Sequence, residues 1–175
     1  MFDPLGQYKD PSKFDLVCSK PSELKEYVRK HLKGNFRVLY VPKSGTVIGH
    51  WRHVGVVCYA AGDVTIGIDE IGFLCKGGNI MPDCKGDEPI LYKIIHFGRH
   101  RNVNVIATAQ RPANMAVSYR ALSTEFRIFR TNEDGDKNYL SERIGQKAAD
   151  LLHTLPDYAF VLWKDNGETG VVQRG

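Results

Sequence analysis

The sequence lacks a long apolar run: none approaches the roughly eighteen residues that a membrane-spanning helix needs. It also lacks a basic segment followed by an apolar one near Met1, which is the pattern of a secretory signal. These absences predict a protein without an integral membrane segment, and we expect it to be intracellular. Because 42% of its residues are hydrophobic and 25% are charged, the chain is expected to fold as one domain, residues 1–175.

Cysteines are few, and none of the four belongs to a C-x-x-C pair. Cys18 and Cys58 lie inside apolar segments, which favours buried thiols. Cys75 and Cys84 precede an H-x-x-x-H pair, a combination that superficially suggests zinc. The gap between these two cysteines is too long for a compact zinc finger. The sequence therefore favours no zinc centre.

Acidic residues are scarce in one region. Between Pro89 and Arg130 there are seven lysines and arginines against a single acid, Glu125, although the net charge of the whole chain is only +4. Such a local excess suits a polyanion, either the phosphates of a nucleotide or a nucleic acid. The alternative is a basic face that only meets solvent.

Apolar strand-like segments alternate with helical ones, which predicts an α/β fold with a mostly parallel sheet. A helix over residues 21–34 should have Ser19 as its N-cap, and a helix over 138–155 should be interrupted near Gly145. An Asn-Gly pair between 158–163 and 169–173 predicts a C-terminal β-hairpin. The other expected elements are strands at 15–19, 36–41, 64–69, 103–108 and 126–130, helices at 46–61 and 88–101, and a mobile loop at 74–87.

The segment VTIGIDE, residues 64–70, is an apolar strand that ends in two adjacent carboxylates, Asp69 and Glu70. A second apolar strand ends in Thr108 and, two residues later, Gln110. An Asp-Glu pair at the carboxyl edge of a buried parallel strand is the Walker B arrangement of P-loop NTPases. There the Asp holds Mg²⁺ and the Glu polarises the attacking water. The companion motif of such enzymes, G-x-x-x-x-G-K-[ST], occurs nowhere in the sequence.

Five segments in this order resemble the FtsK/HerA superfamily of DNA-pumping ATPases: DPLGQY, FRVLYVP, VTIGIDEIGFL, LYKIIHFGRHRNVNVIATAQRP and FRIFRTNEDGDKNYL. Within that superfamily the chain most resembles the genome-packaging ATPases of tailless, membrane-containing viruses, with the zonular-occludens-toxin-like phage ATPases as cousins. The resemblance covers nearly the whole chain. It implies a RecA-like ATPase core that uses ATP and Mg²⁺.

The resemblance also implies roles for individual residues. Gln110 matches a sensor glutamine whose amide can both donate to the γ-phosphate and accept from water. Thr108 falls among the nucleotide-binding residues. Arg99 matches an arginine finger that acts on the neighbouring subunit's nucleotide, with Arg101 as a substitute that also contacts the nucleotide. The alternative for both arginines is that they only complement the dipole at the end of their own helix.

A motor of this family is implied to form a homo-oligomeric ring, a hexamer, that holds DNA through its phosphates without reading the sequence. Lys76, Lys85, Arg111 and Arg120 are the expected DNA contacts. A viral procapsid or a membrane vertex is a further expected partner, and the expected location is the host cytoplasm or the virion.

The missing phosphate loop leaves several interpretations open. Family order places the loop just ahead of DPLGQY, so Met1 would fall inside a strand and the chain would be N-terminally incomplete. Alternatively, the chain is an inactive homologue that acts as a DNA-binding or assembly subunit, or a phage morphogenesis ATPase. The one internal substitute is PKSGTVIG, residues 42–49, in which Lys43–Thr46 would take the place of the loop; its residues stand in the wrong order.

Overall fold

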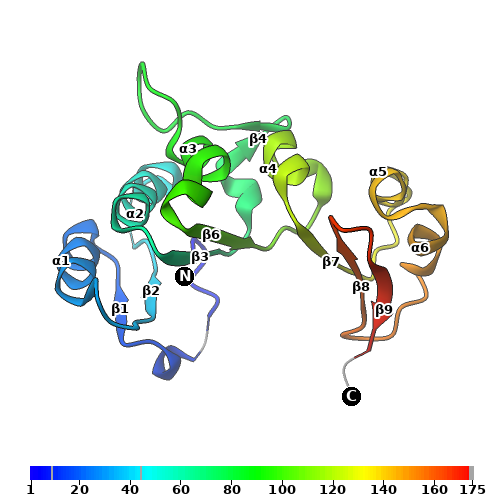
Figure 1. The fold of residues 1–175 in the computed structure, drawn as a ribbon, viewed down its shortest axis with the longest axis horizontal. Helices are drawn as coiled ribbons and strands as arrows, with labels where there is room; N and C mark the ends of the chain where they lie inside the picture. The colour runs from blue at the N-terminus through cyan, green and yellow to red at the C-terminus, as the bar shows by residue number, and fades with distance from the viewer. Residues whose placement is uncertain (9, 44, 174–175) are drawn as a thin grey trace. The chain divides into compact units, whose positions relative to one another are not determined.

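The structure, a computed structural model, describes residues 1–8, 10–43 and 45–173, and their contacts divide into two compact units (Figure 1). Unit 1 comprises Met1–Gln110 and Asn114–Ser118, and unit 2 comprises Arg111–Ala113 and the chain from Tyr119 onward. The predicted α/β class is confirmed. None of the helices in the described ranges is long and apolar enough to cross a membrane.

The sheet of unit 1 is parallel, as predicted. Strand β1 (Leu16–Cys18) pairs with β2 (Val38–Tyr40), and β3 (Val64–Ile68) pairs with β6 (Val103–Ala107). The backbone of Phe2 joins the two pairs, since it forms parallel bridges to Tyr40 on one side and Ile68 on the other. The carboxyl ends of β3 and β6 therefore meet at one edge of the sheet.

Three helices belong to this unit: α1 packs on β1, α2 packs on β3, and α2 contacts both of the other helices. They are α1 (Pro21–His31), α2 (Val47–Ala61) and α3 (Ile90–Phe97). A Cβ at Gly55 of α2 would lie 2.8 Å from a methyl carbon of Ile90, so glycine permits the close approach of α2 and α3. The prediction that Ser19 caps α1 was wrong: Lys20 holds the N-cap position without a side-chain hydrogen bond.

Phe2 is the centre of the core of unit 1. Its ring meets the Trp51 ring edge-on at 5.5 Å between centroids and stacks on Tyr40 at 6.1 Å. All three side chains are almost fully buried. Burying a side chain of this size stabilises the folded state by roughly 1.5–3 kcal/mol. Phe2 thus joins the two pairs of strands and, through Trp51, also packs against α2.

The segment predicted as a mobile loop is partly ordered. It contains an antiparallel hairpin of β4 (Cys75–Lys76) and β5 (Asn79–Ile80), preceded by a 3₁₀ helix, Ile71–Leu74. Ile71 and Leu74 are buried and fix the hairpin to the core. The sequence signal was weak because Gly, Lys and Asp dominate this stretch.

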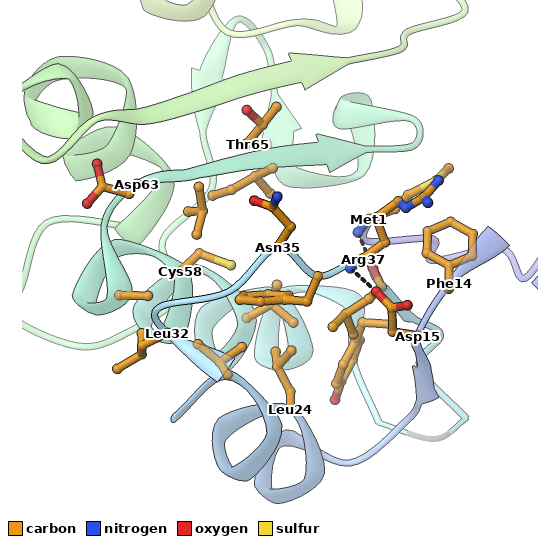
Figure 2. Close-up of a pocket in the computed structure, with 18 of the residues that line it drawn as sticks. Met1, Phe14, Asp15, Leu24, Leu32, Asn35, Arg37, Cys58, Asp63 and Thr65 are labelled. Atoms are coloured by element: carbon orange, nitrogen blue, oxygen red, sulfur yellow. Dashed lines mark hydrogen bonds between the residues drawn. The ribbon is translucent and has the colours of Figure 1, made fainter. Parts of the chain in front are cut away.

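A cavity of about 510 Å³ lies in unit 1 among α1, α2 and the amino ends of the strands (Figure 2). Asp15, Arg37, Cys58 and Thr65 are among its lining residues, and no predicted site residue is. Burial raises the pKa of the Cys58 thiol to about 11, so this thiol stays protonated and is a poor nucleophile or metal ligand. The cavity is separate from the predicted chemistry.

Unit 2 contains an antiparallel sheet in the order β7-β8-β9, which includes the predicted C-terminal hairpin. Its helices meet at Gly145, whose φ of 84° breaks the predicted helix as expected. Leu140, Leu152 and Val161 form the centre of its core. The strands are β7 (Glu125–Phe129), β8 (Phe160–Lys164) and β9 (Thr169–Val172), and the helices are α5 (Asp134–Ile144) and α6 (Gln146–Leu151), while α4 (Val117–Leu122) runs across the division between the units.

Candidate functional site

The pairing register of β3 and β6 brings the predicted site residues together. Ile68 lies opposite Ala107, so the next residues, Asp69 and Thr108, emerge side by side. Backbone hydrogen bonds continue past the strands, because Thr108 N–H donates to the Ile68 carbonyl at 3.0 Å and Ile71 N–H donates to the Thr108 carbonyl at 2.9 Å. The structure thus places Asp69 and Glu70 against the Thr108–Gln110 segment at the carboxyl edge of the sheet.

The Thr108 hydroxyl lies between the two acidic residues. It donates to Asp69 Oδ1 at 2.8 Å and accepts from the backbone N–H of Glu70 at 2.9 Å. Glu70 has a φ of 53°, in the left-handed region that residues other than glycine seldom adopt. Asp69 Oδ2 keeps no hydrogen bond within the part of the chain that the structure describes, so this oxygen is free for a cation or its water.

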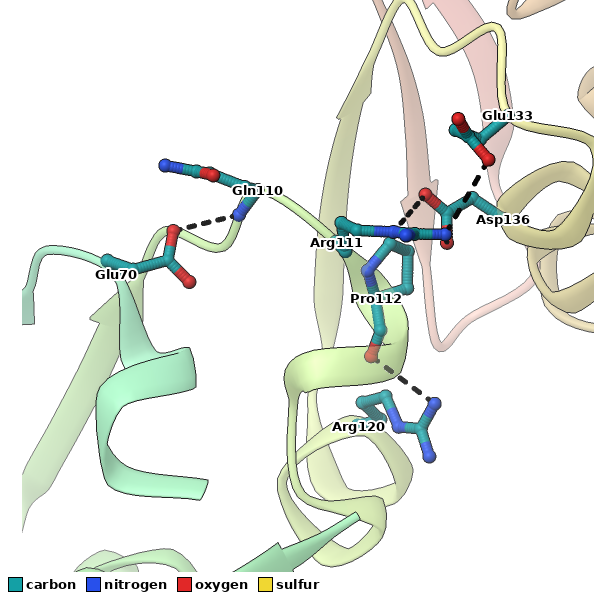
Figure 3. A network of polar contacts seen from close by, with 7 residues as sticks. All are labelled: Glu70, Gln110, Arg111, Pro112, Arg120, Glu133 and Asp136. Atoms are coloured by element: carbon teal, nitrogen blue, oxygen red, sulfur yellow. Dashed lines mark hydrogen bonds and ion pairs between the residues drawn. The ribbon is translucent and has the colours of Figure 1, made fainter. Parts of the chain in front are cut away.

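The Glu70 carboxylate is held by a backbone hydrogen bond on one side and lies against Gly72 on the other. Its Oε2 accepts from the backbone N–H of Gln110 at 3.0 Å (Figure 3). Its Oε1 lies where a side chain at Gly72 would stand, since a Cβ there would be 2.6 Å away. The side-chain amide of Gln110, the predicted sensor, is left exposed rather than used in this contact.

Beside the carboxylates lies a pocket of about 250 Å³, lined by Leu5, Gln7, Asp69, Glu70, Thr108, Ala109 and Gln110. Pockets for whole small molecules are roughly 300–1,000 Å³, so this one has room for a phosphate group rather than for a complete nucleotide. Sequence reasoning missed Leu5 and Gln7 as site residues. The signal was available, because both belong to the DPLGQY segment.

Asp3 shapes the loop that carries Leu5 and Gln7. Its side chain is fully buried and accepts from the backbone N–H groups of Leu5 and Gln7, each at 3.2 Å, and of Tyr8 at 2.9 Å. Three donors converging on one carboxylate hold the loop in a single turn. Asp3 is therefore a structural residue that positions Leu5 and Gln7, which form one wall of the pocket.

Replacing Asp3 by Ala is expected to destabilise the fold by about 2–4 kcal/mol, because three backbone donors lose a charged acceptor. For a chain of this size that corresponds to a drop in Tm of roughly 5–12 °C, which differential scanning calorimetry would measure. Asp10→Ala is the matched control: its exposed carboxylate caps a short 3₁₀ helix, Pro11–Lys13, and little change is expected. Equal Tm values for the two variants would show that Asp3 does not organise the loop.

The two arginines of the GRHR segment differ in their surroundings. Arg101 donates to the carbonyls of Tyr59 at 2.6 Å and Ala60 at 2.9 Å, in the last turn of α2, and its guanidinium lies 5.3 Å from the Tyr59 ring centre. It complements the C-terminal end of α2 rather than of its own helix. Arg99 is exposed, and its guanidinium forms no ion pair or hydrogen bond with the described part of the chain.

Both arginines lie far from the carboxylates of their own chain. They precede β6, a five-residue strand that is roughly 16 Å long, whereas Thr108 and Gln110 follow it. Neither arginine can therefore reach the pocket beside Asp69 within the same unit. The nucleotide contact predicted for Arg101 stays a prediction, and the structure gives this side chain a different partner.

The four predicted DNA contacts fall into two kinds. Lys76 and Lys85 are exposed in unit 1 and form no ion pair within the described residues. In unit 2, Arg111 pairs with the buried Asp136 at 3.2 Å, and the Arg120 guanidinium packs 4.3 Å from the Tyr139 ring centre (Figure 3 shows the Arg111 pair). Both arginines thus have structural partners, and their role in DNA binding stays a prediction.

The structure describes part of the possible substitute phosphate loop, Lys43–Thr46, since Ser44 lies outside the described residues. Thr46 is the N-cap of α2, and its hydroxyl accepts from Gly49 N–H at 3.1 Å. The threonine of this segment is thus used as a helix cap, as Thr commonly is.

The residues present fit a magnesium ion held mainly by substrate. Within the described ranges, no three His, Cys, Asp or Glu side chains gather as a ready-made metal site. Mg²⁺ commonly takes only one or two carboxylates from the protein and completes its octahedron with water and phosphate oxygens. Asp69, with one oxygen fixed and one free, matches that requirement.

Comparison with known proteins supports the fold. No family model and no curated protein matches the sequence. Among solved structures, the genome-packaging NTPase B204 of Sulfolobus turreted icosahedral virus 2 superposes with a TM-score of 0.71 in complexes with ATP-γ-S and with sulfate, each at 18% identity. The match covers 98% of this chain and 79% of that chain in the ATP-γ-S complex, and 98% and 78% in the sulfate complex.

The DNA-packaging ATPase B204 of Sulfolobus turreted icosahedral virus matches with a TM-score of 0.63 and 17% identity, over 93% of this chain and 83% of that chain. At such low identity these similarities establish the fold. The predicted resemblance is thus confirmed at the level of the fold, which this chain shares with these packaging ATPases.

Proposed function

We propose that this chain is the ATPase domain of a motor that moves DNA, most closely a viral genome-packaging motor. The observation that carries the proposal is the register of β3 and β6, which places Asp69, Glu70 and the Thr108–Gln110 segment at one edge of a parallel sheet. Ligands of open α/β sheets bind outside the carboxyl ends of the strands. The similarity to structures solved with ATP analogues supports the same proposal.

In the proposed reaction Asp69 would hold Mg²⁺, and the ion would supply positive charge that stabilises the transferred phosphoryl group of bound ATP. Glu70 orients the attacking water and takes its proton, and Gln110 contacts the γ-phosphate through its exposed amide. Arg99 reaches the nucleotide of the next subunit in a homo-oligomeric ring, a hexamer. The motor holds DNA without sequence preference and works with a procapsid or membrane vertex, in the host cytoplasm or the virion.

A second candidate function is a DNA-binding or assembly subunit that does not hydrolyse ATP. The absence of G-x-x-x-x-G-K-[ST] from the 175 residues favours it, because no Lys and no ring of backbone N–H groups is then supplied for the β- and γ-phosphates. Calorimetric titration with Mg-ATP and a phosphate-release assay with added DNA separate the candidates, when both are made on a form of the protein with a phosphate-binding strand, loop and helix joined ahead of Met1. Turnover stimulated by DNA supports the motor; DNA binding without nucleotide binding or turnover supports the subunit.

DNA binding is expected to depend on salt, because the contacts go to phosphates. Each Lys that meets a phosphate contributes about 0.9 to the slope of log affinity against log salt concentration. The double variant Lys76→Ala/Lys85→Ala should therefore lower that slope by close to two on any DNA sequence. Fluorescence anisotropy with two unrelated duplexes measures it.

The matched control is Lys25→Ala/Lys33→Ala, which removes two exposed lysines in and just after α1. This control should leave the slope unchanged. If both double variants lower the slope of log affinity against log salt concentration by the same amount, the DNA is attracted by general positive charge. It is then not bound specifically by the β4–β5 hairpin and the loop that follows it. A strong preference for one duplex would contradict a packaging role.

A further inference from the structure

Thr108 is tied into the turn after β3 through every polar group that it has. Its N–H and C=O extend the β3–β6 ladder to Ile68 and Ile71, and its hydroxyl is shared between Asp69 and Glu70. A hydroxyl has one proton and two acceptor positions. Because the proton goes to Asp69 Oδ1, the oxygen is left to accept from Glu70 N–H, and one side chain serves both acidic residues.

From this geometry we propose that Thr108 is a positioning residue, which sets the orientation of the Asp69 carboxylate and of the Glu70 backbone. The inference rests on the proposed function and assigns Thr108 a different part in it from direct contact with the nucleotide. With Oδ1 engaged by Thr108, Oδ2 is the oxygen of Asp69 that no hydrogen bond from the described residues occupies. The bond to Glu70 N–H holds that residue at its positive φ of 53°.

The positive φ matters because it places Glu70 in the left-handed region directly after β3. A residue with a Cβ resists this conformation unless its surroundings hold it there. The surroundings here are the Thr108 hydroxyl on the N–H, Gln110 N–H on the carboxylate and the space left by the missing side chain of Gly72. Of these three, Thr108 is the one that also hydrogen-bonds to Asp69, so it couples the Asp69 carboxylate to the Glu70 backbone.

The test compares Thr108→Val, which has nearly the same shape without the hydroxyl, with Thr108→Ser, which keeps the hydroxyl. NMR on the full ¹⁵N,¹³C-labelled chain measures the three-bond couplings to Asp69 Cγ, which report its χ1 rotamer, and the hydrogen exchange of the Glu70 amide. Wild type and Thr108→Ser should show one Asp69 rotamer and a protected amide. Thr108→Val should show averaged couplings and at least about tenfold faster exchange.

Thr65→Val is the matched control, since Thr65 is an exposed threonine on the adjoining strand β3; it should behave as wild type. Thr108→Ala, which cannot clash, repeats the test if the valine variant does not fold. A single Asp69 rotamer in a folded variant without the hydroxyl, or its loss in Thr108→Ser, would overturn the proposal. The measurement needs no nucleotide, so a lack of ATP turnover would count against the proposed function only.

Discussion

Glu70→Gln is expected to lower ATP turnover by about 10²–10⁴-fold, the usual contribution of a general base. The assay uses a form of the protein with a phosphate-binding strand, loop and helix joined ahead of Met1. Gln has nearly the shape of Glu, and its carbonyl oxygen can still accept from Gln110 N–H. Affinity for a non-hydrolysable Mg-ATP analogue should therefore stay within about threefold, because the Asp69–Thr108 contact is untouched.

The control for this prediction is Glu88→Gln, which changes an exposed glutamate ahead of α3 and should leave turnover unchanged. Phosphate release measures turnover and calorimetry measures analogue affinity. Turnover of Glu70→Gln within about threefold of wild type would mean that Glu70 is not the base. Loss of analogue binding in the same variant would instead make Glu70 a ligand-binding residue.

The structure shows a hydrogen bond at Glu70 that the sequence did not predict and that bears on how the attacking water is bound. The Glu70 carboxylate is bonded to Gln110 N–H, so one of its oxygens is occupied before any water is activated. Water can then be bound by Oε1 or by the second acceptor position of Oε2. Because Gln110 also carries the sensor amide, movement of this residue on nucleotide binding would change what Glu70 can accept.

The fold and the central carboxylates were predictable because their signals are local. An apolar β-rich run that ends in Asp69 and Glu70 marks a buried strand, and alternation with helices marks a parallel sheet. Parallel pairing then requires the carboxyl ends to meet, so the sequence alone is enough to expect Gln110 near Glu70. The break at Gly145 and the C-terminal hairpin followed from glycine chemistry in the same way.

The remaining features depend on contacts between distant residues, which no local pattern encodes. Arg101 contacts Tyr59 and Ala60, more than forty positions earlier, so its capping of α2 was hidden. The Thr108 bridge depends on an exact register between β3 and β6, since a shift of one residue would turn the hydroxyl to the other face. In the sequence Asp3 is notable only as part of DPLGQY. The structure shows that it is buried and that it organises the loop through three backbone hydrogen bonds.

The second large effect is expected from substitutions of Arg99 and Arg101 in the GRHR segment. Arg99→Ala is expected to lower turnover by about 10³-fold or more while leaving Tm unchanged, since an arginine finger is worth roughly 10³–10⁵ in kcat and the Arg99 guanidinium bonds to no group of the described chain. Arg101→Ala should instead lower Tm by roughly 3–6 °C, because α2 loses its C-terminal partner. Scanning calorimetry and phosphate release, both on the form of the protein with the phosphate-binding segment joined ahead of Met1, separate the two residues.

The finger should act between subunits, because Arg99 and the Asp69–Glu70 pair lie at opposite ends of strands β6 and β3. Mixing Arg99→Ala subunits with Glu70→Gln subunits therefore creates interfaces in which an intact Glu70 meets an intact Arg99 from its neighbour. Such mixtures should recover part of the turnover that each variant lacks alone. If pull-down through two different tags shows that the variants co-assemble and no turnover returns, Arg99 does not act on the neighbouring subunit.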